Sequence, residues 1–137
     1  MRRKLGAAIG TTVGALLLGV MGSGQAHAVD YPDYTDCFLV DVGGNGWFGG
    51  GAYHRDIRLK VTDRAADGHH VAIRFVSYNA TTGKDKYWSW HHLYDGKGSQ
   101  KFWDTYANDS TGGLNSVGIQ AAVMEGSEVI SNCTNWV

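Results

Sequence analysis

The stretch DIRLKVTD, residues 56–63, decides the fold class of this chain. Its apolar side chains fall at Ile57, Leu59 and Val61, and charged or polar side chains fill the positions between them. Successive side chains of a strand point to opposite faces, so this alternation predicts a strand with one buried face. No segment of the chain shows a clear helical pattern, and Gly is abundant at 20 residues while Pro occurs once.

The same alternation recurs along the chain in HHVAIRFVSY (residues 69–78), VGIQAAV (117–123) and EVISNCTNW (128–136), and CFLVDV (37–42) is a further short apolar run. Turn-forming clusters separate these runs, and the Asp67-Gly68 pair is a hairpin cue. About seven strands at this spacing predict an all-β protein, a small antiparallel β-sandwich or open barrel.

Aromatic residues concentrate in KYWSWHHL, residues 86–93, and in KFWDTY, residues 101–106. As a regular strand, the first run places Trp88, Trp90 and His92 on one face, with Tyr87, Ser89, His91 and Leu93 on the other. The second run places Phe102, Asp104 and Tyr106 opposite Trp103 and Thr105. Because DGKG lies between the two runs, we expect them to form a hairpin.

The two cysteines, Cys37 and Cys133, are predicted to form one disulfide between the first and last strand regions. In the chain-entropy model, closing a loop of this size stabilises the fold by about 4–5 kcal/mol.

The first 28 residues have the pattern of a secretory signal. Basic residues at Arg2, Arg3 and Lys4 precede an apolar region, and Ala26 and Ala28 supply the small residues that signal peptidase requires. We therefore predict a signal peptide over residues 1–28, a single secreted β domain over residues 29–137, and an extracellular or cell-surface location. Removing the signal leaves nine basic residues against 13 acidic ones, and this acidic balance disfavours nucleic acid or an anionic membrane as a partner.

The segment GGNGWFGGGAY, residues 43–53, is expected to be a loop, or else a place where the backbone approaches another part of the protein closely. Trp47 and Phe48 lie in its middle. Both faces of the predicted aromatic hairpin carry rings, so part of its aromatic surface is expected to be exposed. The candidate binding residues are Trp47, Phe48, Trp88, Trp90 and Trp103.

The sequence predicts no catalytic residue, metal site or cofactor. Adjacent histidines in a strand point to opposite faces, so His69-His70 and His91-His92 cannot each chelate one ion. His70 and His92 could meet across adjacent strands and offer nitrogen ligands to zinc, yet no spacing requires this, and we expect polar surface histidines. The serines lack a nucleophile-elbow motif in residues 29–137.

The signal segment and the placement of Cys37 and Cys133 near the two ends resemble small secreted proteins of high-GC Gram-positive bacteria. In this format the chain is similar to the spore-associated protein type, a resemblance that implies secretion and carries over no functional residue. The leading hypothesis is a non-enzymatic extracellular or cell-surface protein that binds a cell-wall polysaccharide or an extracellular protein through surface aromatics. The alternatives are an enzyme inhibitor or toxin-like effector that uses residues 43–53, and a small hydrolase.

Overall fold

A computed structural model of the chain describes residues 28–137, which form an all-β structure. Residues 1–27 of the predicted signal peptide lie outside the described residues. The described part has nine strands rather than about seven. They are β1 Asp33–Phe38, β2 Val42–Gly51, β3 His54–Asp63, β4 His70–Asn79, β5 Lys84–Tyr87, β6 His91–Leu93, β7 Gln100–Asn108, β8 Ser116–Glu125 and β9 Glu128–Trp136. None of the described residues forms a helix of the length and apolarity that crossing a membrane requires.

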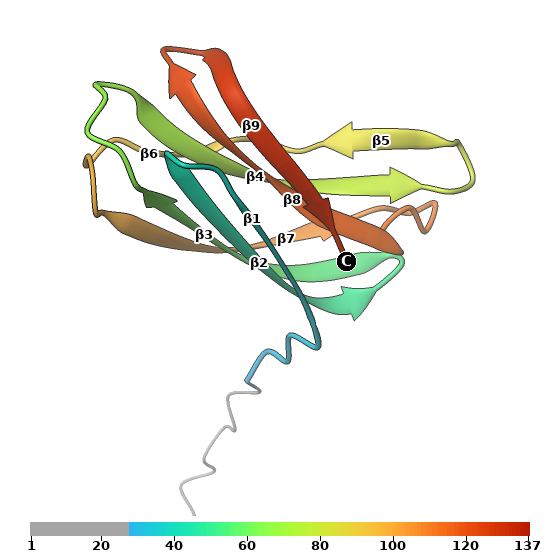
Figure 1. Ribbon diagram of the computed structural model, residues 1–137. Helices are drawn as coiled ribbons and strands as arrows, with labels where there is room; N and C mark the ends of the chain where they lie inside the picture. Colours follow the sequence, from blue (N-terminus) through green and yellow to red (C-terminus); the bar gives the residue numbers. More distant parts are fainter. Residues whose placement is uncertain (1–27) are drawn as a thin grey trace, which may run out of the picture.

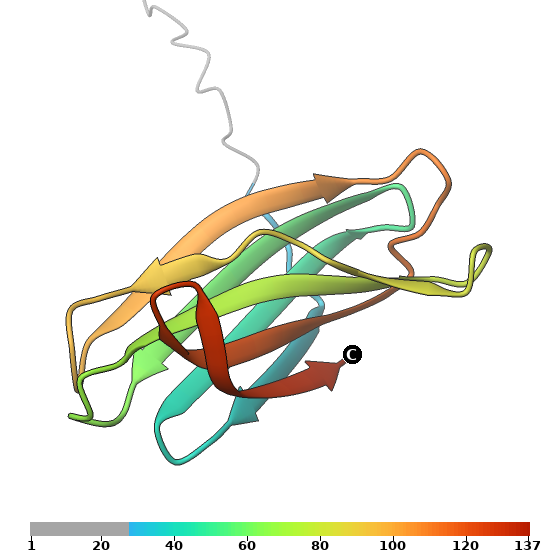
Figure 2. The ribbon, with the colours of Figure 1, turned by 90° about the horizontal axis from the view of Figure 1, so that it is seen from above.

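The strands form two antiparallel sheets that pack face to face, which confirms the predicted sandwich (Figure 1). The first sheet has the order β1-β2-β3-β7. The second has the order β5-β4-β8-β9, and β6 pairs with β4 beyond the end of β5. Seen from above, the strands of the second sheet lie over those of the first (Figure 2).

The core lies between the two sheets and follows the predicted alternation. Ile57, Leu59 and Val61 of β3 are at most 1% exposed. They belong to the same buried cluster as Ile73 of β4 and Ile119 of β8. The period of two in these strands therefore identified the inward faces correctly.

The glycine-rich segment is a strand, so the expectation of a loop over residues 43–53 was wrong. Residues 42–51 form β2, which lies between β1 and β3 and pairs with both. The alternative, a close backbone approach, is confirmed: a Cβ on Gly44 would lie 2.7 Å from Cβ of Ala121 in the facing sheet. The glycines let β2 pass close under β8 where a side chain would push the sheets apart. One alternative hypothesis gave this chain an inhibitory loop over residues 43–53. Because residues 42–51 form a strand, that segment is not a free loop.

The predicted aromatic hairpin is also absent. β6 pairs with β4 and β7 pairs with β3, so the turn between them carries the chain from the second sheet to the first. The Asp67-Gly68 turn likewise links β3 to β4 across the sheets. Turn residues show where the chain reverses, and the apolar faces to be buried decide which strands then pair.

A β-bulge interrupts the edge of the second sheet. Val76 lies opposite Tyr87 and Ile73 lies opposite His91, so the two residues between them on β4 face three residues, Trp88 to Trp90. One extra residue in an edge strand reverses the direction of every later side chain, compared with the direction that regular alternation would give it. This is why Trp88 and Trp90 lie on opposite faces and not on the same one, as a regular strand would have placed them.

The predicted disulfide is present. Cys37 of β1 and Cys133 of β9 are bonded, with their Cα atoms 5.9 Å apart. β1 and β9 are edge strands of the two different sheets. The bond therefore closes one side of the sandwich, and the opposite side, between β7 and the β5–β6 edge, has no covalent link.

Candidate binding surface

The structure separates the five predicted binding residues into four places. Trp47 lies on the outer face of the first sheet, and Phe48 lies in the core. Trp88 and Trp103 border the open side of the sandwich, and Trp90 lies on the outer face of the second sheet. They do not form one aromatic platform.

Phe48 is fully buried and stacks at an angle on Phe75, with ring centroids 5.6 Å apart. It follows Trp47 in β2 and therefore points to the opposite side of the sheet. In this position it offers a ligand no surface.

The open side of the sandwich contains a small pocket of about 160 Å³. Its walls come from both sheets and are lined by Ile57, Phe75, Trp88, Ser89, His91, Thr105 and Tyr106. Trp88 is held in place because its indole nitrogen donates to Oγ of Ser77 at 3.0 Å. Burial, and then the neighbouring His92, lower the pKa of His91. The bulge of the β5–β6 edge forms one wall of this pocket.

Trp90 covers a small second cluster made of Ala72, Ala122 and Met124. The guanidinium of Arg74 lies 4.1 Å from the centroid of Trp90 and 4.5 Å from that of Tyr87. Arg74 also donates from Nε to Gln120 at 2.8 Å. These contacts fill the space above Arg74, so Trp90 has mainly a packing role.

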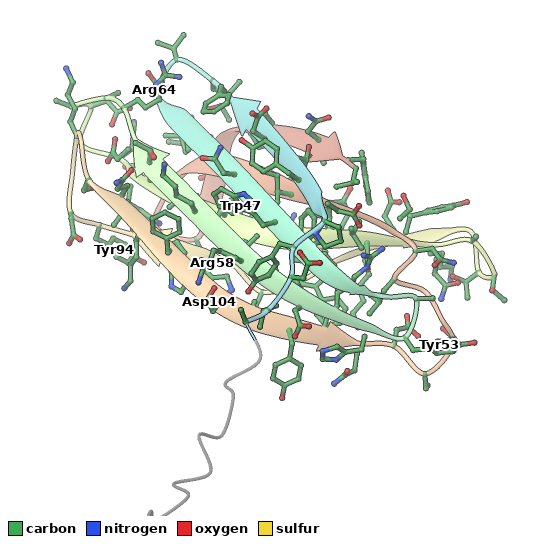
Figure 3. The ribbon with its side chains drawn as sticks, turned by 90° about the horizontal axis from the view of Figure 1, so that it is seen from below. Trp47, Tyr53, Arg58, Arg64, Tyr94 and Asp104 are labelled. Carbon is green, nitrogen blue, oxygen red and sulfur yellow. A yellow bond between two sulfur atoms is a disulfide. The ribbon has the colours of Figure 1, made fainter. Side chains whose placement is uncertain are left out.

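Trp47 belongs to a larger exposed surface, which we call the aromatic face. It consists of outward side chains from all four strands of the first sheet: Tyr34, Trp47, Arg58, Lys60, Phe102 and Asp104. Strand register aligns four of them, because Tyr34 lies opposite Trp47, Trp47 opposite Arg58, and Arg58 opposite Asp104. Figure 3 shows Trp47, Arg58 and Asp104 together on this side of the sheet.

The rings of the aromatic face are continuous. Trp47 is the middle ring, 5.4 Å from Tyr34 and 6.1 Å from Phe102 between centroids. Tyr34 and Phe102 are 47% and 50% exposed, so this apolar surface is open to solvent. Lys60 lies over Phe102, with Nζ 5.6 Å from the ring centroid. Trp47 itself is half-buried between these two exposed rings, and a row of neighbouring rings that reaches solvent is typical of a recognition surface.

Polar groups border the rings in fixed positions. Arg58 binds Asp104 through two hydrogen bonds, Nε to Oδ1 at 2.6 Å and Nη2 to Oδ2 at 3.0 Å. These bonds lower the pKa of the Asp104 carboxyl. At the other side, Asn45 donates to the hydroxyl of Tyr34 at 2.8 Å, and that hydroxyl donates to Asp36 at 3.0 Å. The face thus offers ring surfaces together with oriented donors and acceptors, and its Asp104 is already committed to an ion pair.

Sequence reasoning found Trp47 but did not connect it to Tyr34 or Phe102. The alternation of residues 101–106 placed Phe102 and Asp104 on the same face of their strand. Their meeting with Trp47 depends on β7 pairing with β3, a contact between distant parts of the chain that alternation alone does not specify.

The histidines are distributed over several surfaces. His70 and His92 do meet, with Nε2 and Nδ1 3.0 Å apart, whereas His54 lies on the first sheet and bonds Asn108 and Asp56. Among residues 28–137, no group of three or more His, Cys, Asp or Glu side chains is arranged to hold a metal ion.

Comparisons of the chain with protein-family models, with curated proteins and with solved structures found no match.

Proposed function

We propose that this chain is a non-enzymatic binding protein that is secreted and acts outside the cell or at its surface, where the aromatic face binds a polysaccharide. The observation that carries the proposal is the continuous row of rings, with half-buried Trp47 between exposed Tyr34 and Phe102, bordered by oriented polar side chains.

The chemistry of the face suits a sugar chain. A pyranose ring has C–H groups on its faces and hydroxyl groups around its edge, so it can stack on an aromatic ring while its hydroxyls bond polar neighbours. Trp47 and Phe102 supply ring surfaces, and Arg58, Asp104 and Asn45 supply donors and acceptors beside them.

The shape of the face favours a polymer over a small molecule. Small ligands bind in concave pockets that enclose most of their surface. The aromatic face instead runs across four strands and is open to solvent. Many stacking contacts along a chain are the way such an open surface gains affinity.

Secretion is part of the same proposal. It is supported by the signal pattern of residues 1–28 and by the Cys37–Cys133 disulfide, since such bonds persist in oxidising compartments.

The test is a binding assay of residues 29–137 with insoluble and soluble cell-wall polysaccharides, using Trp47→Ala and Phe102→Ala variants. The wild type should be retained by at least one polysaccharide, and each variant should bind about tenfold or more weakly, because one central ring typically contributes at least that much. Circular dichroism should confirm that the variants fold.

The matched control is Tyr53→Ala. Tyr53 is 66% exposed and lies at the turn between β2 and β3, away from the ring row (Figure 3). This variant should bind like the wild type. Retention of polysaccharide by all three variants, or by none of the proteins including the wild type, would reject the proposal; capture of an extracellular protein by the same face would point to that class of partner instead.

A further inference from the structure

His70 and His92 form a close pair on the outer face of the second sheet. Ala72 lies opposite His92 in the pairing of β4 with β6, so His70, two residues before Ala72, is the diagonal neighbour of His92. Nε2 of His70 and Nδ1 of His92 are 3.0 Å apart. This surface is on the opposite side of the sandwich from the aromatic face.

The spacing of these nitrogens matches that of two ligands of one metal ion. A transition metal holds imidazole nitrogens at about 2.0–2.1 Å, so two neighbouring ligand nitrogens lie about 3 Å apart. In the metal-free pair one nitrogen must carry a proton that the other accepts. An ion that replaces that shared proton must lie to one side of the line between the nitrogens, because half of 3.0 Å is shorter than a metal–nitrogen bond, and both rings turn toward it.

The two rings are already oriented by their surroundings. The ring of Tyr94 lies 4.4 Å from that of His70 and 5.8 Å from that of His92, between centroids.

We propose that His70 and His92 form a two-histidine site for a divalent first-row transition metal ion, such as Zn²⁺, Ni²⁺ or Cu²⁺, with water in the remaining positions. Imidazole suits these ions, whereas Ca²⁺ and Mg²⁺ require oxygen ligands. The site departs from the expectation of surface histidines without a metal. It would tie the three-residue strand β6 to β4 and so hold the edge of the second sheet.

The test uses residues 29–137 without a histidine tag, and titrates Zn²⁺ and Ni²⁺ by calorimetry, with Ca²⁺ as the negative control. The wild type should bind one ion of Zn²⁺ or Ni²⁺, and its thermal midpoint should rise in their presence. His70→Gln and His92→Gln should each weaken binding about tenfold or more, as expected when one of two ligands is lost. His54→Gln should bind like the wild type, because His54 lies on the other sheet.

A second measurement does not depend on how the variants fold. In the wild type, paramagnetic Ni²⁺ should broaden the imidazole NMR signals of His70 and His92 before those of His54 and His91. No binding by the wild type, binding by both variants as tight as that of the wild type, or broadening centred on another histidine would each overturn the proposal.

Discussion

Gly44 of β2 lies directly against Ala121 of β8 across the interior of the sandwich. A Cβ on Gly44 would come within 2.7 Å of Cβ of Ala121 and within 3.3 Å of Ile73. The two sheets are therefore closer here than two side chains allow, and the missing Cβ of Gly44 sets their separation.

We expect Gly44→Val to destabilise the fold by about 1–3 kcal/mol, because the added methyl groups must displace packed side chains of the facing sheet. Urea unfolding followed by tryptophan fluorescence measures the change in free energy of unfolding.

Gly51→Ala is the matched control in the same strand. No atom lies within 4 Å of a Cβ at Gly51, so this change should stay within about 0.5 kcal/mol of the wild type. If both variants lose the same free energy of unfolding, the stability of β2 depends on its glycine content and not on the close approach of the two sheets.

The fold class could be predicted because apolar alternation is a direct record of which face is buried. β3, β4 and β8 each carry this record, in residues such as Leu59, Ile73 and Ile119. In β2 this record is interrupted, since Gly44 and Gly46 occupy the inward positions between Val42 and Phe48 and have no side chain to alternate. Its strand character comes from neighbours on both sides, which are a property of the whole fold.

The binding surface was less predictable for a related reason. Trp47 was identified by residue type alone, but the face around it depends on strand order. Phe102 and Tyr34 reach Trp47 only because β7 and β1 lie on either side of the β2–β3 pair. Residue type selects candidates, whereas long-range pairing decides which of them share a surface.

The disulfide gives a second prediction. Cys37→Ala combined with Cys133→Ala should lower the free energy of unfolding by about 2–5 kcal/mol, because the bond restricts a large loop of the unfolded chain. Urea unfolding of the variant should match that of the wild type under reducing conditions. Equal stability of the oxidised and reduced wild type would contradict the view that this bond holds the sheet edges together.

The ion pair of the aromatic face gives a third prediction. In Arg58→Gln the pKa of Asp104 should rise toward the ordinary carboxyl value, because the two hydrogen bonds that favour its ionised form are lost. In the wild type, the stabilisation from this pair is present above the ordinary carboxyl pKa and is lost as the pH falls through the lowered one. NMR titration of the Asp104 carboxyl carbon measures the shift.

Asp109 is the internal control for this titration. Its pKa is lowered mainly by a hydrogen bond from Thr111, in the turn that follows β7. The Arg58→Gln change should leave the pKa of Asp109 unchanged. A shift of both carboxyls would indicate a general change in structure and not the loss of one pair.

The bulge beside the pocket gives the last prediction. Ser89 is the extra residue, because removing it would align Trp88 with Phe75 and Trp90 with Arg74 between the existing pairs Val76–Tyr87 and Ile73–His91. All later side chains would keep their observed faces, so deletion of Ser89 should cost less than about 1 kcal/mol and should narrow the pocket that Ser89 lines.

Deletion of His92 is the contrasting variant, because it removes a residue from the regular part of β6. Leu93, which is 2% exposed, would then turn from the core to solvent, at a cost of about 2–5 kcal/mol, as for the loss of a buried leucine side chain. Urea unfolding of the two deletions compares them directly. If both deletions lower the free energy of unfolding equally, the edge strand does not tolerate a change of length. If neither deletion lowers it, the register of β6 does not determine which side chains are buried.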